Sequence, residues 1–217
     1  MRRLSETSDR AISARLRSWL RVATDRQRAE GLAWYPMAQE IAANIAARVG
    51  ISRHAAASTI AALSPRNRWL RNLDDAENLA AAWATGEPQE SVTVCTPHAN
   101  RRKAWAALNG VPISDKAAKT HAFSLNISRL DPGRVTIDVW AMRSALVPPS
   151  ELARLPEPPD CQESPTACQY RRLERLHLET PLDTTFLTDL LVLSILTVFY
   201  VAIRLCGCRF QRNVVDL

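Results

Sequence analysis

One carboxylate in this sequence stands in a setting that could support chemistry. Asp138 lies within the apolar stretch Val135–Trp140, near the expected start of a helix. The unpaired N–H groups at a helix N-terminus favour a negatively charged partner. A carboxylate held there could stabilise a developing positive charge or activate a water molecule. Asp138 could also act only as the cap of the helix, and the two interpretations are compatible.

Basic residues supply the second group of candidates. Arg101, Arg102 and Lys103 form a cluster close to Trp105. This cluster could bind phosphate, or it could be the solvated face of a helix whose tryptophan is buried. The chain carries 28 Lys and Arg residues against 22 Asp and Glu residues, for a formal net charge of +6. This modest basic excess fits nucleic-acid binding but also many other cytosolic proteins.

The pattern of possible metal ligands favours neither a metal nor a small-molecule cofactor. The sequence has no Gly-rich phosphate loop and no H-E-x-x-H zinc motif. Cys161, Cys168, Cys206 and Cys208 could together ligate zinc, but they lack the compact spacing of known zinc sites. We therefore expect no metal and no cofactor.

The N-terminus and the cysteine count indicate a reducing compartment. Met1-Arg2-Arg3 is positively charged, but no apolar stretch follows it as in a signal peptide. The chain has five cysteines, and an odd number without a secretory signal argues against disulfide pairing. We expect a cytoplasmic protein.

The apolar residues recur at helical spacing through the first two-thirds of the chain, and no alternating strand pattern occurs. Residues 1–147 are therefore expected to form an all-α domain. Capping residues and helix stops place the expected helices at Ser8–Ala29 with Gly31 as the stop, Pro36–Val49, Ser52–Leu63, around 73–83 with Gly86 as the stop, Thr96–Gly110, Ser114–Ile127 and Val135–Val147.

The composition changes after Val147. Residues 148–169 hold six prolines and are expected to form a linker, and residues 170–217 form a C-terminal tail with one charged helix at Tyr170–Glu179. Leu190–Ile203 is apolar and uncharged, but its 14 residues are short for a membrane span, and extending it to 186–208 includes Asp189 and Arg204. Three interpretations stay open: a buried helix, which we favour, a C-terminal membrane anchor, and a tail foreign to the domain, for example after a reading-frame change.

Three segments, in order along residues 35–147, resemble the helix-hairpin-helix DNA glycosylases. Ala61–Asn67, which contains L-S-P-R, is similar to the L-S-x-Q step of that family. Asn100–Ala104 looks like its N-x-K-A helix, and Val135–Arg143 is similar to its V-D-T/V-H-V-x-R signature, where the aspartate is catalytic. Lys119-Thr120 lies where the family places the hairpin G-V-G-x-K-T-A. The A-L-S-P…T-I-D-V-W-A pattern also resembles a branch of actinobacterial and phage proteins.

This resemblance implies a helix-hairpin-helix glycosylase-like fold with a DNA cleft between two helical lobes. It implies hydrolysis of the N-glycosidic bond of a damaged or modified base in double-stranded DNA, by a monomer. Asp138 would stabilise the cationic transition state or activate water, and Arg66 and Asn67 would hold the opened duplex. Lys119 would be a Schiff-base nucleophile, as in bifunctional members of that family. The residues expected to contact DNA are Arg66, Asn67, Arg101, Arg102, Lys103 and Lys116.

Each of these residues also has a purely structural interpretation. Arg66 and Asn67 could form a surface turn whose Asn67 caps the next helix, and Lys119 could be a solvated lysine or a phosphate contact. The hairpin glycines are absent, since Ile113–Thr120 reads I-S-D-K-A-A-K-T, and Trp140 replaces the histidine of the family. These departures favour an alternative from another class, a non-catalytic helical DNA-binding module. A third alternative is a tail-anchored interaction protein.

Overall fold

The computed structural model describes residues 4–131, 133–152 and 165–180. These residues form helices joined by loops, without a β-strand among them, so the all-α expectation is confirmed for the described part. The helices pack into two separate units. We call residues 35–136 the central unit, and we call the described parts of 1–34 and 137–217 the terminal unit.

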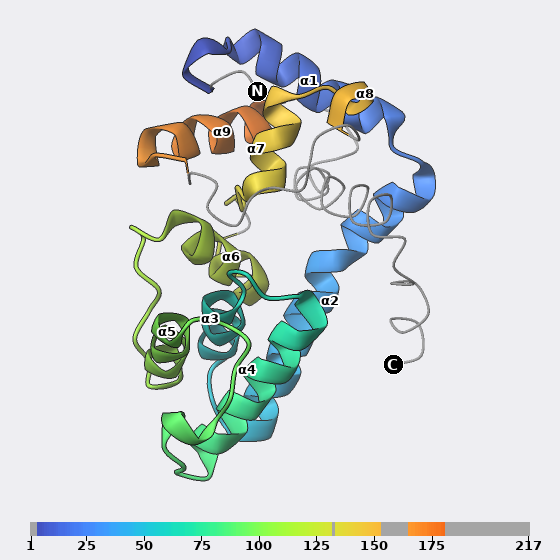
Figure 1. Cartoon of the computed structure of the whole chain (residues 1–217). Coiled ribbons are helices and arrows are strands. Elements are labelled where there is room, and N and C mark those ends of the chain that lie inside the picture. Colours follow the sequence, from blue (N-terminus) through green and yellow to red (C-terminus); the bar gives the residue numbers. More distant parts are fainter. Residues whose placement is uncertain (1–3, 132, 153–164, 181–217) are drawn as a thin grey trace. The chain divides into compact units, whose positions relative to one another are not determined.

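The central unit is arranged around a buried helix of small residues. Its elements are the second part of α2 (Asp25–Val49), then α3 (Arg53–Leu63), α4 (Trp69–Ala84), the short η2 (Gln89–Ser91), α5 (His98–Leu108) and α6 (Ala118–Ser128). Helix α3 packs against α4, α5 and α6 (Figure 1). Residues 55–63 of α3 are all buried, and their many alanines let the neighbouring helices approach closely.

Polar contacts join α2 to α6 within the central unit. The Tyr35 hydroxyl donates to Thr136 Oγ1 at 3.1 Å, and Asn126 Nδ2 donates to the same oxygen at 3.1 Å. Gln39 Nε2 donates to the Asn126 carbonyl at 2.9 Å. Since Tyr35 and Asn126 are buried, these bonds hold the two helices in a defined register.

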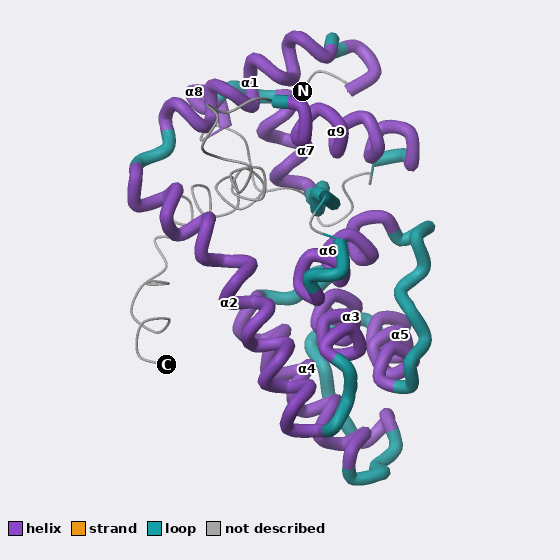
Figure 2. Tube along the Cα trace, turned by 180° about the vertical axis from the view of Figure 1, so that it is seen from behind, coloured by secondary structure: helices purple, strands orange, loops and turns teal. Residues whose placement is uncertain are grey.

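The terminal unit packs the first helix of the chain against the last described one. Its elements are η1 (Leu4–Glu6), α1 (Asp9–Val22), the first part of α2, α7 (Val139–Leu146), α8 (Pro149–Leu152) and α9 (Ala167–Glu179). Helix α1 packs against α7 and α9 (Figure 2). Trp19 Nε1 donates to the carbonyls of Ser144 and Val147, each at 3.2 Å. Hydrogen bonds from Arg175 and Arg172 lower the pKa of Asp9.

The expected boundary between the first two helices is wrong. The chain leaves helical geometry at Ala23, and Thr24 and Gln27 then form a reciprocal cap in which each side chain accepts from the other residue's N–H. Helix α2 runs from there through Gly31 and Pro36 without a stop. Pro36 removes one backbone bond inside the helix, and burial of Tyr35 and Ala38 on the same helix offsets that loss.

Several other boundaries differ by a few residues. Ser8 and Ser52 cap α1 and α3 as expected. Thr96 does not cap α5, which begins at His98 after Pro97. Ser114 and Asp115 form a turn, and α6 begins only at Ala118. Val135–Ile137 is not helical, so the seventh helix begins at Val139 with Asp138 as its cap.

The expected charged helix of the tail begins three residues earlier, at Ala167, after a capping box formed by Thr166 and Gln169. Helix α9 belongs to the terminal unit with α1. The expected division into 1–147, 148–169 and 170–217 stays a prediction. The apolar segment 186–208 lies outside the described residues, and in the part of the chain that is described no helix is long and apolar enough to cross a membrane.

Candidate functional site

The turn after α3 holds Arg66 in an unusual backbone conformation. Helix α3 ends at Leu63, and Asn67 N–H donates back to the Ser64 carbonyl at 3.1 Å. Arg66 has φ of 61°, in the left-handed region that non-glycine residues seldom occupy. Such strain persists only where the surroundings enforce it. The exposed Arg66 side chain is thus carried on a turn that must be held from elsewhere.

The buried carboxylate of Asp75 anchors this turn. Its carboxylate is 1% exposed and accepts a hydrogen bond from Asn67 Nδ2 at 2.8 Å. The same oxygen accepts the backbone N–H of Cys95 at 2.9 Å, and Arg71 Nε lies 3.4 Å from the other oxygen. One buried carboxylate therefore ties the Ser64–Asn67 turn to the loop before α5. The Asn67 amide donates to this buried carboxylate and so helps to hold the turn that carries Arg66.

The local sequence does not mark Asp75 as important, but one signal could have found it. At helical spacing Asp75 shares a face of α4 with Asn72, Ala76 and Leu79, all of which are buried. A carboxylate on a buried face must be paired or hydrogen-bonded, because an isolated buried charge is costly. The position of Asp75 on a buried face therefore indicates hydrogen-bond partners in other segments, although the sequence does not show which residues these are.

A second set of bonds joins the turn to the start of α5. Thr96 Oγ1 donates to the Pro65 carbonyl at 3.2 Å, and Asn100 Nδ2 donates to Thr96 Oγ1 at 2.8 Å. Arg101 Nη1 donates to the Val92 carbonyl at 3.0 Å. Arg101 is half-buried, and this bond gives it a structural role. Arg102 and Lys103 are exposed.

The segment Ile113–Thr120, where the glycosylase family places its hairpin, contains a turn at Ser114–Ala117. Ala117 N–H donates to the Ser114 carbonyl at 3.0 Å, and Lys116 N–H donates to Ser114 Oγ at 3.3 Å. The His121 ring nitrogen Nδ1 lies 2.9 Å from the Ile113 carbonyl and holds the preceding loop to α6. Lys116 and Lys119 are both exposed.

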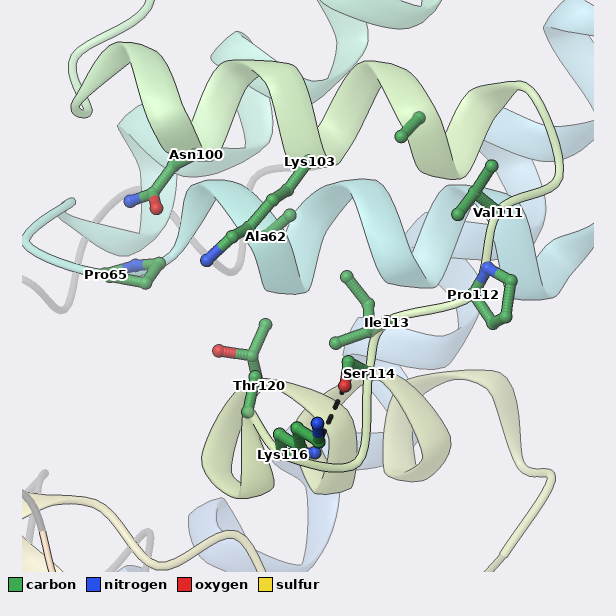
Figure 3. A pocket seen from close by; sticks show the side chains of 12 residues that line it. Ala62, Pro65, Asn100, Lys103, Val111, Pro112, Ile113, Ser114, Lys116 and Thr120 are labelled. Carbon is green, nitrogen blue, oxygen red and sulfur yellow. Dashed lines mark hydrogen bonds between the residues drawn. The ribbon is translucent and has the colours of Figure 1, made fainter.

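These three regions of the central unit surround one pocket of about 490 Å³ (Figure 3). Asn100 and Lys103 extend from α5, and Thr120 faces the same space from α6. The lining residues are Ala62, Pro65, Asn100, Lys103, Ala106, Val111, Pro112, Ile113, Ser114, Lys116, Ala117 and Thr120. The structure thus brings residues at the end of α3 together with residues of α5 and of the loop that follows it, and no acidic residue lines the pocket.

Asp138 lies in the terminal unit, as the N-cap of α7. Its Oδ1 accepts the backbone N–H groups of Trp140 at 2.9 Å and Ala141 at 2.8 Å. The preceding residue is anchored as well, since Ile137 N–H donates to the Tyr170 hydroxyl at 3.0 Å. Asp138 as a residue is half-buried. Its Oδ1 is oriented by the helix terminus.

Trp140 takes the place of the histidine in the signature of the helix-hairpin-helix DNA glycosylases, and it packs within the same helix. The guanidinium of Arg143 lies 5.1 Å from the centroid of the Trp140 ring, a cation–π distance. Arg143 is buried, so this pair is part of the packing of α7. Trp140 thus supports the helix that carries Asp138 and supplies no acid or base.

No group of three or more His, Cys, Asp or Glu side chains that could hold a metal occurs among the described residues. Cys95 and Cys168 are free thiols at the surface. The other candidate zinc ligands, Cys161, Cys206 and Cys208, lie outside the described residues.

Comparison with known proteins gives one match. A model of a family described as a family of unknown function (DUF7178) matches residues 1–153. No curated protein and no solved structure matches the chain. The matched range includes the Ser64–Asn67 turn, the pocket and Asp138.

Proposed function

The chain belongs to this family of unknown function (DUF7178), and we propose that it is a DNA-binding enzyme that hydrolyses the N-glycosidic bond of a damaged or modified base. The observation that carries the proposal is the carboxylate of the half-buried Asp138, which two N–H groups of α7 hold in a fixed direction. The order of the L-S-P-R, N-x-x-K-A and T-I-D-V-W segments along the chain supports the same reaction class.

In this reaction the bond between C1′ of the sugar and the base nitrogen breaks, and its electron pair leaves with the base. The sugar acquires positive charge at C1′ in the transition state, which a nearby carboxylate stabilises. Water then adds to C1′, and Asp138 accepts the proton that the water loses. A carboxylate whose direction is set before substrate arrives loses little entropy in doing this.

The central unit would supply the contacts to the DNA backbone. Arg66 projects from a turn that is held by Asp75, and Arg102, Lys103, Lys116 and Lys119 are exposed cations. Cations of this kind bind phosphates and displace condensed counterions. Binding should therefore weaken steeply as the salt concentration rises.

The test is base release by the full chain on duplexes that each carry one damaged or modified base. Asp138→Asn keeps an oxygen that can accept the Trp140 and Ala141 N–H groups but removes the charge. Asp25→Asn is the matched control, because Asp25 is an exposed carboxylate in the first turn of α2 in the same unit. We expect release by the wild type and by Asp25→Asn, and its loss in Asp138→Asn while DNA binding persists.

Lys119 provides a separate test of the type of glycosylase. It lies exposed in the first turn of α6, without the desolvation that activates a lysine nucleophile. We therefore infer hydrolysis by water, without a Schiff base. Reduction with borohydride during turnover should trap no covalent protein–DNA complex, and a trapped complex that disappears in Lys119→Ala would contradict this inference.

A non-catalytic DNA-binding module is the second candidate. It is favoured by the fact that capping of α7 alone accounts for the two hydrogen bonds that orient Asp138. In that case the wild type and Asp138→Asn would bind DNA equally, and neither would release a base. The same panel of duplexes therefore separates the two candidates.

A further inference from the structure

The pocket of the central unit has properties that the reaction at Asp138 does not use, although two of its lining residues, Lys103 and Lys116, are also proposed contacts to the DNA backbone. Its volume of about 490 Å³ lies within the range of roughly 300–1,000 Å³ that is typical of small-molecule sites. All of its lining residues belong to the central unit, whereas Asp138 belongs to the terminal unit. A ligand could therefore bind here whether or not the protein releases bases.

One side of the pocket is apolar and open. Val111, Pro112 and Ile113 contribute to its lining, whereas Pro65 lies at the opposite end of the pocket (Figure 3). Val111 is 55% exposed although it is a large apolar side chain. The loop that carries three of these residues leaves α5 at Gly110, whose φ of 84° suits glycine. Exposed apolar side chains around a concave site favour a ligand with a flat apolar body.

The polar lining is basic and rich in hydrogen-bonding groups. Lys103 comes from α5 and Lys116 from the turn before α6, and Ser114, Thr120 and Asn100 add hydroxyl and amide groups (Figure 3). No carboxylate lines the pocket, and no ion pair of either lysine occurs among the described residues. A lining with two lysines and no carboxylate favours an anionic ligand.

We propose that this pocket binds a nucleoside monophosphate unit. The two lysines would bind the phosphate, the apolar wall would cover the base, and the hydroxyl and amide groups would contact the sugar and the base edge. Inorganic phosphate alone would leave the apolar wall uncovered. The unit could be a free nucleotide or the 5′-phosphorylated end of a DNA strand, because both present the same chemistry.

The experiment is calorimetric titration of the full chain at low salt with deoxyadenosine 5′-monophosphate, with deoxyadenosine and with inorganic phosphate. We expect the nucleotide to bind more tightly than either fragment. Lys103→Ala and Lys116→Ala should each weaken nucleotide binding by about tenfold, as expected for loss of a charged hydrogen bond. Arg53→Ala, which removes an exposed cation at the other end of α3, should leave it unchanged.

Ala106→Phe provides a test that does not depend on charge. Ala106 lines the pocket from α5 and is half-buried, so a phenyl ring there should fill the site and abolish binding. Circular dichroism and thermal melting of each variant confirm that the fold is kept. If Ala106→Phe folds and binds the nucleotide as tightly as the wild type does, the ligand lies elsewhere and the proposal is wrong.

The remaining outcomes also decide the question. No nucleotide binding by the wild type, equal binding of deoxyadenosine, or equal binding of inorganic phosphate would each overturn the proposal. Competition by a 5′-phosphorylated oligonucleotide, but not by the same strand without its phosphate, would identify the strand end as the ligand. Binding of the free nucleotide without such competition would identify the free form. Base release plays no part in these measurements, so their failure would leave the proposed function standing.

Discussion

Asn67 and Asp75 are joined by a hydrogen bond of 2.8 Å from the Asn67 amide to a carboxylate that is almost completely buried. This bond links the turn that carries Arg66 to the first half of α4. The same carboxylate oxygen accepts the Cys95 N–H, so a single side chain orders two loops. The geometry of the candidate DNA-contacting turn therefore depends on a residue that would itself touch no DNA.

Replacing Asp75 should cost both stability and DNA affinity. Asp75→Asn removes the charge and directs an amide toward two donors, so we expect a loss of about 1–3 kcal/mol in the free energy of unfolding. Urea unfolding measures this value. Asp74→Asn changes an exposed carboxylate on the same helix and should alter stability by less than about 0.5 kcal/mol.

A double-mutant cycle isolates the Asn67–Asp75 bond. The effects of Asn67→Ala and Asp75→Asn should not add, because each variant removes the same contact. Additive effects would show that Asp75 acts only through Cys95 and Arg71. The Arg66 turn would then be held by other contacts.

Asp138 should show separable structural and chemical roles. Asp138→Ala removes the N-cap of α7 and should destabilise the protein by about 1 kcal/mol, whereas Asp138→Asn should lose less because it can still accept the two N–H groups. Thermal or urea unfolding gives both values. If Asp138→Asn destabilises the protein as much as Asp138→Ala does, loss of base release in Asp138→Asn could not be assigned to the charge.

His177 should make the protein sensitive to mild acid. It is completely buried in α9, Nδ1 donates to the Leu173 carbonyl at 2.8 Å, and burial lowers its pKa to about 4. Because an unfolded histidine has a pKa of about 6.5, the unfolded chain binds the additional proton between these values. Stability should therefore fall as the pH decreases from about 6.5 to about 4, by on the order of 3 kcal/mol, and this contribution should level off below pH 4.

His177→Leu tests this assignment. The leucine cannot bind a proton, so the difference in unfolding free energy between wild type and variant should change across pH 4–6.5 and stay constant above pH 7. Urea unfolding at several pH values measures this difference. The pKa of His54 is also lowered, chiefly by burial. Its contribution to the unfolding free energy is the same in both proteins, so it does not affect the difference between them. A difference that does not depend on pH would show that His177 is not the group that titrates.

Pro36 should limit the stability of α2. It lies exposed inside that helix, where proline lacks the N–H that would donate to the carbonyl of residue 32. Pro36→Ala should therefore raise the free energy of unfolding by about 1–3 kcal/mol. Glu40→Ala, an exposed change one turn later in α2, is the control and should have little effect. A lower stability of Pro36→Ala would mean that the proline imposes a bend on which the packing of α2 depends.

Much of the secondary structure is determined by short-range signals in the sequence. Ser8 and Ser52 cap α1 and α3 as predicted, and the helices expected around 73–83 and at Tyr170–Glu179 lie within α4 and α9. These signals act between residues that are three or four positions apart, so they can be recognised without knowing the rest of the fold. The same local logic identified Asp138 as a helix cap.

Only the tertiary structure decided the features that depend on distant partners. The local sequence predicts a helix stop at Gly31 and a new helix start at Pro36, yet α2 runs through both residues, and Tyr35, Ala38 and Ala42 of this helix are buried. Asp75 gains its role from Asn67 and Cys95. The pocket lies where the alanine-rich helix α3 meets α5 and the turn before α6. Burial and buried hydrogen bonds of this kind outweigh local helix penalties of about 1 kcal/mol for glycine and about 3 kcal/mol for proline. Spacing along the chain does not reveal which segments will supply them.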